Sequence, residues 1–138
     1  MLDKDVNVIL AHIRIRGAVE AESDAPEEIR VHAGQRLLVK LTYRLVETQQ
    51  DQEHWRFGLS SSLGGRTADP VNVEWGDRWG IPDDRFGSLA QTYTMDTPGT
   101  YDLEFLAFGE LLVGKWGSGQ ADQAERREVQ KTLKVIVA

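Results

Sequence analysis

The sequence predicts an all-β domain in which two sheets pack face to face, and two observations support this prediction. Apolar and polar residues alternate with a period of two in segment after segment of the chain, which is the pattern of strands that bury one face. Clusters of Gly, Pro, Asp and Ser separate these segments at short intervals. Short strands with turn signals between them, and no long helical period, are typical of a β-sandwich or barrel.

Length and composition indicate one domain that spans residues 1–138. A chain of 138 residues with 41% hydrophobic content is long enough to bury a core without covalent cross-links. Cysteine is absent from the sequence, which excludes disulfides, thiolate catalysis and cysteine-rich zinc sites.

The charge balance argues against two classes of partner. The 16 basic and 22 acidic side chains leave a net charge of -6, whereas binding to nucleic acid or to an anionic membrane depends on a dense positive face. No apolar run approaches the length of about 18 residues that a membrane span needs. Residues 1–20 do not show the basic and then apolar pattern of a signal peptide. We therefore expect a cytoplasmic or particle-borne protein.

The first predicted strand changes its inward face near Ala11. Apolar residues occupy even positions before this point and odd positions after it, namely Val6, Val8 and Leu10, then Ile13 and Ile15. Such a change indicates a β-bulge or a switch between sheets. A loop over 17–28 follows, and an Ala33-Gly34 turn lies between the next two strands. Further strands are expected over 29–31, 37–45, 55–59, 71–75, 89–95 and 101–107.

In two stretches the sequence is compatible with more than one local structure. Residues 60–65, which end in Gly64-Gly65, are expected to close a strand as a hairpin or loop. A C-terminal strand is expected over 133–137, with its start between 125 and 132. Residues 120–129 are rich in Ala, Gln, Glu and Arg, which favour a short helix as the alternative.

Three stretches of the sequence carry a family resemblance. Glu28 to Gln35 leads through an Ala-Gly turn into an alternating strand, and Trp55 lies on the strand after it. The segment Tyr93 to Leu103 combines a Tyr, a Pro-Gly turn and a Thr-Tyr pair. Together they resemble the immunoglobulin superfold, in particular its PKD-type domains. The resemblance implies an antiparallel β-sandwich with Trp55 buried and with the Tyr101 hydroxyl bonded to backbone upstream of the turn. The fold itself implies no activity.

Patterns that suggest catalysis or nucleotide binding are weak. Residues 109–116 match a phosphate-binding loop except at the last position, where Trp116 replaces the Ser or Thr that would bind magnesium. Gly117-Ser118-Gly119 follows in place of a helix, so we interpret the segment as a long hairpin loop. No Ser, His and acid set lies near a nucleophile motif. The sequence therefore predicts a protein that is not an enzyme and carries no cofactor.

Metal-binding patterns are weak as well. His12, His32 and His54 lack metal-ligand spacing and fall on the polar phase of strands, so we expect them on the surface. Asp77, Asp83 and Asp84 flank a Gly-Pro loop that offers oxygen ligands to calcium, but the EF-hand spacing is absent. No metal site is assigned, and calcium binding by the Asp77 to Asp84 loop stays open.

The candidate partner-binding residues lie near one glycine-flanked segment. Residues 108–117 are predicted to form a protruding loop or ribbon, because Leu111, Leu112 and Val113 would be exposed at its tip unless a partner covered them. The predicted partner-binding residues are Phe108, Leu111, Leu112, Val113 and Trp116. Tryptophans in loops also form stacking platforms for sugars, and Trp79 and Trp116 are the candidates here, whereas Trp75 is expected in the core.

Three functions are compatible with this pattern. The leading hypothesis is a non-enzymatic interaction or assembly module, such as a structural component of a phage virion, that binds a protein partner or a second copy of itself. A carbohydrate-binding or adhesive module is the alternative. A small hydrolase on a β-sandwich is the third, because such folds host many activities.

Overall fold

The described chain consists of strands and turns. The computed structural model describes residues 5–15, 21–45, 53–67, 72–77, 85–113 and 122–138, and at 53–54, 67, 72–77, 85–86, 113 and 122–124 it describes the backbone alone. No helix occurs in these ranges. The all-β prediction is therefore confirmed, and the helix considered for residues 120–129 is wrong from residue 122 onward, where the last strand begins.

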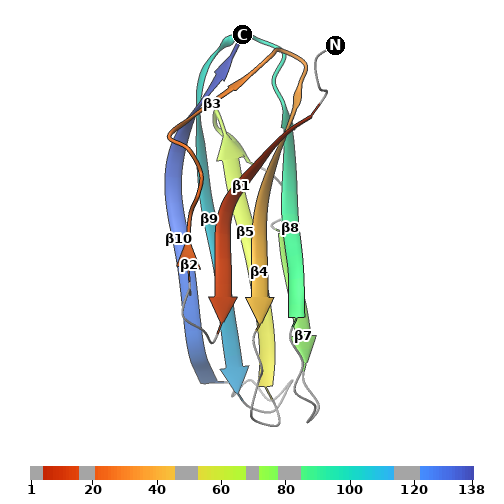
Figure 1. Ribbon diagram of the computed structural model, residues 1–138, viewed down its shortest axis with the longest axis vertical. Helices are drawn as coiled ribbons and strands as arrows, with labels where there is room; N and C mark the ends of the chain where they lie inside the picture. Colours follow the sequence, from red (N-terminus) through yellow and green to blue (C-terminus); the bar gives the residue numbers. More distant parts are fainter. Residues whose placement is uncertain (1–4, 16–20, 46–52, 68–71, 78–84, 114–121) are drawn as a thin grey trace.

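Ten strands follow one another along these ranges (Figure 1). Their bounds are β1 (Asp5–Ile15), β2 (Ala21–Glu22), β3 (Glu28–Val31), β4 (Arg36–Leu45), β5 (Glu53–Leu63), β6 (Arg66–Thr67), β7 (Asn72–Asp77), β8 (Arg85–Thr94), β9 (Gly99–Val113) and β10 (Asp122–Val137). The longest are β9 and β10, which pair with each other along most of their length.

The strands form two sheets that pack against each other. The four-stranded sheet has the order β2-β1-β4-β8, and the six-stranded sheet has the order β3-β10-β9-β5-β6, with β7 also paired to β5. In Figure 1, β1, β4 and β8 lie in front of β9 and β5. Most neighbours are antiparallel, as expected, but β1 with β4 and β3 with β10 are parallel. The β1 and β4 pair is parallel because the chain crosses to the other sheet as β3 between them.

The core lies between the two sheets, as the sequence predicts. Trp55, Tyr43, Leu103 and Phe105 are buried, together with Leu41 and Val135. The Tyr43 ring stacks on the Phe57 ring with centroids 4.2 Å apart. The Trp55 ring is tilted relative to the Phe57 ring, and the centroids of these two rings are 5.8 Å apart. The predicted burial of Trp55 is therefore confirmed.

The predicted change of face in β1 is a β-bulge. The register between β1 and β4 shifts between Ile9 and Ala11. Val8 and Leu10 are buried before the shift, and Ala11, Ile13 and Ile15 are buried after it. One extra residue thus lets the strand keep apolar side chains inside on both sides of the bulge.

The turn between β5 and β6 lies at the predicted glycine pair, but β5 is longer than expected. Gly64 and Gly65 have φ angles of 58° and 83°, the left-handed backbone that two-residue hairpins of type I′ require. Residues 60–63, which were expected in the turn region, continue the strand.

A tyrosine fixes the corner between β8 and β9. The Tyr101 hydroxyl donates a hydrogen bond of 2.7 Å to the backbone carbonyl of Thr97, upstream of the Pro98-Gly99 turn, as predicted. The same ring covers Gly64, where an added Cβ would lie 2.8 Å from Tyr101 Cδ1. Tyr101 therefore joins the corner to the β5–β6 turn.

Replacing Tyr101 with Phe is expected to lower the free energy of unfolding by about 0.5 to 1.5 kcal/mol, because one hydrogen bond is lost while the ring contact with Gly64 remains. Urea denaturation monitored by tryptophan fluorescence measures the change. Tyr101→Leu, which removes the ring as well, should cost more than Tyr101→Phe. An unchanged midpoint for Tyr101→Phe would show that the hydroxyl contributes nothing.

Candidate functional site

The segment predicted as a protruding loop is mostly a central strand. Residues 108–113 belong to β9, which is paired with β5 on one side and β10 on the other, so the loop and hairpin-loop predictions are wrong for these residues. Leu111 is fully buried in the core and is not available to a partner in this fold. Val113 is placed by its backbone in β9, and Trp116 and Trp79 lie outside the described residues. Their partner or sugar contacts stay predictions.

The outer face of β9 carries more apolar residues than a solvated sheet face needs. Leu103, Phe105, Ala107 and Leu111 point into the core, and the alternate residues are half-buried or exposed except for Glu110. These outward residues are Glu104, Leu106, Phe108, Glu110 and Leu112. Two of the predicted contact residues, Phe108 and Leu112, therefore lie on one face of the six-stranded sheet.

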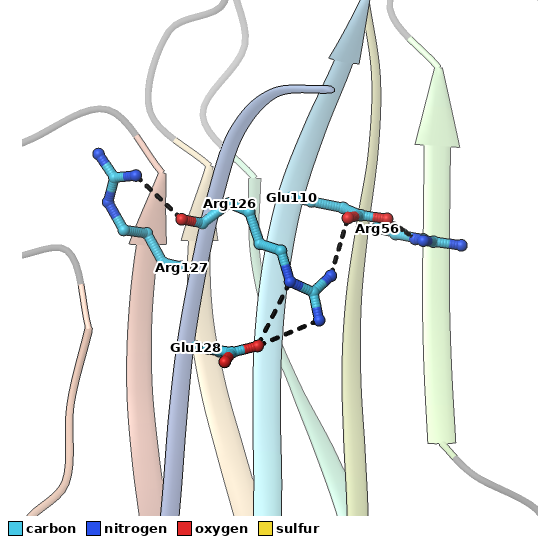
Figure 2. A network of polar contacts seen from close by, with 5 residues as sticks. All are labelled: Arg56, Glu110, Arg126, Arg127 and Glu128. Atoms are coloured by element: carbon cyan, nitrogen blue, oxygen red, sulfur yellow. Dashed lines mark hydrogen bonds and ion pairs between the residues drawn. The ribbon is translucent and has the colours of Figure 1, made fainter. Parts of the chain in front are cut away.

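A buried carboxylate organises this face. The Glu110 side chain is only 3% exposed, and its carboxylate forms ion pairs with Arg56 from β5 and Arg126 from β10, whose side chains are 35% and 34% exposed. Arg126 Nη1 donates to Glu110 Oε2 at 2.8 Å, and Arg126 Nη2 lies 3.3 Å from Glu128 Oε2. Figure 2 shows the Glu110 carboxylate between the two guanidinium groups.

The two ion pairs hold the arginine side chains in place. A carboxylate removed from water is unfavourable unless it is paired and hydrogen-bonded, and Glu110 meets this condition with a partner on each side. Arginine side chains fixed in this way lose less conformational entropy when they bind a partner. The network therefore presents two preorganised guanidinium groups on an open sheet face.

Phe108 lies between the same two arginines. The ring centroid is 4.7 Å from Arg126 Cζ and 5.7 Å from Arg56 Cζ, which are favourable cation–π distances. The ring also covers Gly58 of β5, where any Cβ would overlap it. Gly58 thus lets the Phe108 ring lie down on the sheet. We use the name arginine–phenylalanine cluster for Arg56, Gly58, Phe108, Glu110, Arg126 and Glu128.

A shallow hollow lies beside the arginine–phenylalanine cluster on the same sheet. Its volume is about 340 Å³, and its lining is mainly polar. The outward side chains that line it are Ser60, Ser62, Glu104, Leu106, Gln130 and Thr132. Small hydroxyl side chains on β5 leave this space open next to bulkier residues of β9 and β10.

The histidines, which were expected on the surface, do not form a metal site within the described part of the chain. His12 is half-buried and bonded to Asp24, with Nε2 and Oδ2 2.8 Å apart, and His32 is exposed. The side chain of His54 lies outside the described part. No group of three or more His, Asp or Glu side chains could hold a metal ion among the residues that the structure describes. The calcium candidates Asp77, Asp83 and Asp84 fall outside the side chains described.

Comparison with known proteins leaves the all-β sandwich as the class that the fold defines. No protein-family model, no curated protein and no solved structure matches the chain. The described ranges contain no helix that could cross a membrane.

Proposed function

We propose that this chain is a non-enzymatic, immunoglobulin-like assembly domain that pairs with a second copy of itself through the outer face of the six-stranded sheet. The strand pairing supports the immunoglobulin-like assignment. β5, β9 and β10 lie side by side as strands C, F and G do in such domains, and β4 pairs with β8 as B does with E. Buried Trp55 on β5 and the Tyr101 corner fit the same scheme. The PKD-type assignment rests on the Tyr93 to Leu103 segment alone.

One observation carries the assembly proposal. The outward side of β9 presents Leu106, Phe108 and Leu112, all half-buried, whereas the solvated face of an antiparallel sheet is normally polar. Two arginines flank the Phe108 ring. Aromatic and arginine side chains are enriched in the buried centres of protein interfaces, so the arginine–phenylalanine cluster has the composition of an interface centre.

The charge distribution favours a second copy as the partner. The whole chain carries a net charge of -6, so most orientations of two copies bring like charges together. Within the arginine–phenylalanine cluster, Arg56 and Arg126 balance Glu110 and Glu128. A neutral, partly apolar surface on a negatively charged protein is where two copies approach with the least repulsion, and a twofold axis through it would use the same residues from both chains.

Leu106→Glu tests this proposal, because it places one extra carboxylate per chain in the proposed interface. We expect wild-type protein to sediment as a dimer and the variant as a monomer, with the same circular dichroism and thermal midpoint. Ile9→Glu is the matched control, because Ile9 is 40% exposed on the other sheet. This substitution also introduces a carboxylate, but outside the proposed interface, so the Ile9→Glu variant should remain a dimer.

Two results would overturn self-association. One is a wild-type monomer at roughly 1 mM, where association stronger than about −4 kcal/mol would be visible. The other is an equal loss of dimer in the Ile9→Glu and Leu106→Glu variants. That result would show that the contact between the two copies lies elsewhere or is non-specific.

Carbohydrate binding is the second candidate, and the hollow beside Phe108 favours it. Serine, threonine, glutamine and glutamate side chains line this hollow, and Phe108 is the next outward residue of β9 after the lining residue Leu106. Such a combination offers hydrogen bonds and stacking to a sugar. A wild type that stays monomeric, with amide NMR shifts at Gln130 and Thr132 on addition of soluble oligosaccharides, would favour this function over assembly.

A further inference from the structure

The outer face of the six-stranded sheet has two unlike halves that meet at Leu106 of β9. On one side lies Phe108, and the Cζ atoms of Arg56 and Arg126 are 5.7 and 4.7 Å from its ring centroid. On the other side lies Glu104, which lines the hollow of about 340 Å³. Phe108 and Glu104 are each two residues from Leu106, or about 7 Å along the strand. We call these the bulky half and the hollow half of the face.

Small side chains on the neighbouring strands shape the hollow half. Ser62 of β5 and Thr132 of β10 are the register partners of Glu104, and Ser60 of β5 is a register partner of Leu106. A cavity of about 150 Å³ is enough to hold a benzene ring. The hollow, at about 340 Å³, therefore has room for an aromatic side chain from another molecule.

Glu104 is a carboxylate that still lacks a partner. Its side chain is exposed and makes no hydrogen bond or ion pair within the described part of the chain. The next acidic residue on this face, Asp102, already forms an ion pair with Lys134 of β10. Glu104 therefore gives the hollow half a negative charge that a docking molecule could neutralise.

The bulky half offers the complementary group. Arg126 directs its Nη1 atom to Glu110 and its Nε and Nη2 atoms to Glu128 (Figure 2), but a guanidinium group carries more N–H donors than these contacts use. The Arg126 side chain is 34% exposed and lies against the Phe108 ring. A carboxylate brought over the Phe108 ring would therefore meet an arginine that the network already holds in place.

Symmetry determines whether the two halves can meet. In two sheets stacked face to face, a twofold axis that crosses the strands next to Leu106 places Phe108 of each copy over Glu104 of the other. The same axis places β5 over β5 and β10 over β10 of the second copy. A twofold axis along the strands would place Phe108 over Phe108 instead, and both hollows would stay empty. Because an isologous interface uses the same patch from both copies, the first axis alone joins unlike halves.

We propose that the second copy docks about the axis that crosses the strands at Leu106, so that each bulky half packs into the hollow half of the other copy. Phe108 and Arg126 of one copy then cover Glu104 of the other. Close packing at the interface centre and opposite charges in contact are the features that stabilise and orient specific protein interfaces. This inference rests on the proposed self-association and adds the geometry of the dimer.

Cross-linking of single-cysteine variants tests this geometry, because the chain contains no cysteine. Gln130 of β10 and Ser60 of β5 are the register partners of Leu106, so each lies near its own equivalent in the proposed dimer. We expect Gln130→Cys and Ser60→Cys each to give a covalent dimer with a short bis-maleimide reagent, measured on a denaturing gel. Thr92→Cys is the control, since Thr92 is exposed on β8 of the other sheet. It should stay monomeric on the gel.

A charge reversal tests the contact between the halves. Glu104→Arg should raise the dissociation constant of the dimer by about tenfold or more in sedimentation experiments, because it sets a new guanidinium group against Arg126 of the second copy. Asp96→Arg is the matched control. It makes the same change of charge at an exposed residue of the β8–β9 connection, outside the face, and should not weaken the dimer. Equal thermal midpoints of the two variants check that both are folded.

The outcomes separate this geometry from self-association itself. A dimer that cross-links only in a mixture of Gln130→Cys and Ser60→Cys has β10 over β5, so its axis runs along the strands and the proposed docking is wrong. A dimer that gives no cross-link with either variant or their mixture uses another surface. Equal weakening by Glu104→Arg and Asp96→Arg would overturn the contact with Glu104. A wild type that stays monomeric at roughly 1 mM overturns self-association and this docking with it.

Discussion

Replacing Leu111 with Ser is expected to destabilise the domain by about 3 to 5 kcal/mol, enough to unfold much of the protein at physiological temperature. Leu111 is fully buried on the inner side of β9. The change leaves a cavity and places a hydroxyl in an apolar environment, and the two penalties add. Urea denaturation followed by tryptophan fluorescence gives the free energy of unfolding.

The next residue in the chain provides the matched control. Leu112 is half-buried on the outer face of the same strand, so Leu112→Ser makes the same chemical change and should cost about 1 kcal/mol or less. If Leu111→Ser kept the wild-type midpoint and lost assembled mass instead, Leu111 would contact a partner, as the loop hypothesis required, and the position of β9 would be wrong.

Gly109→Ala is expected to lower the free energy of unfolding by about 1 to 3 kcal/mol, or more if the strands cannot shift. Gly109 lies on the inner side of β9, where a Cβ would come 2.5 Å from Phe57 Cε1 and 2.9 Å from Ile13 Cγ2. Added volume in a packed core forces side chains from their preferred rotamers. The measurement is again equilibrium denaturation.

Phe57→Leu should partly rescue Gly109→Ala, because the smaller side chain makes room for the new methyl group. Each single change is destabilising, so the double variant is expected to lose less than the sum of the two losses. Strict additivity in this double-mutant cycle would mean that the Phe57 ring does not fill the space above Gly109.

The error at residues 108–113 has a physical cause. In most strands of this chain the inward positions are apolar, but here the inward position 109 is a glycine, whose space the Phe57 ring occupies. The outward positions include Phe108 and Leu112, whose apolar character is unusual for an exposed face. Because of these inward and outward exceptions, the segment does not alternate between apolar and polar residues, and Gly109 then indicated a loop. The partner strand β5 accounts for Phe108, whose ring lies over Gly58, and for Gly109, whose space Phe57 fills.

The start of β10 could not be predicted from the sequence for a different reason. Its inward positions are apolar at Leu133 and Val135, but towards the beginning of the strand Lys131 and Arg127 lie on either side of the single apolar residue Val129. Lys131 is half-buried and donates to the Ala25 backbone carbonyl at 3.0 Å. Long polar side chains therefore replace apolar ones on this side of the sandwich, and a polar segment rich in helix-forming residues does not show its strand period.

Local patterns predicted the features that depend on local sequence. The bulge in β1, the Gly64-Gly65 turn, the burial of Trp55 and the Tyr101 corner each follow from a short stretch of residues. The candidate sites do not. Glu110 meets Arg56 from a strand much earlier in the chain, and it meets Arg126 only because β10 pairs with β9.

The two parallel pairings also set the order in which the domain can fold. Within the described chain, β3 pairs only with β10, which joins residues 28–31 to residues 134–137. Closing so long a loop is slow compared with forming the antiparallel pairs of neighbouring strands, and contacts of this kind place folding in the millisecond to second range. Until β10 is in place, Ile29 and Val31 have no sheet to cover them. A chain in which β3 has not yet paired with β10 therefore exposes an apolar strand edge, and we expect misfolding and aggregation to begin at this early segment.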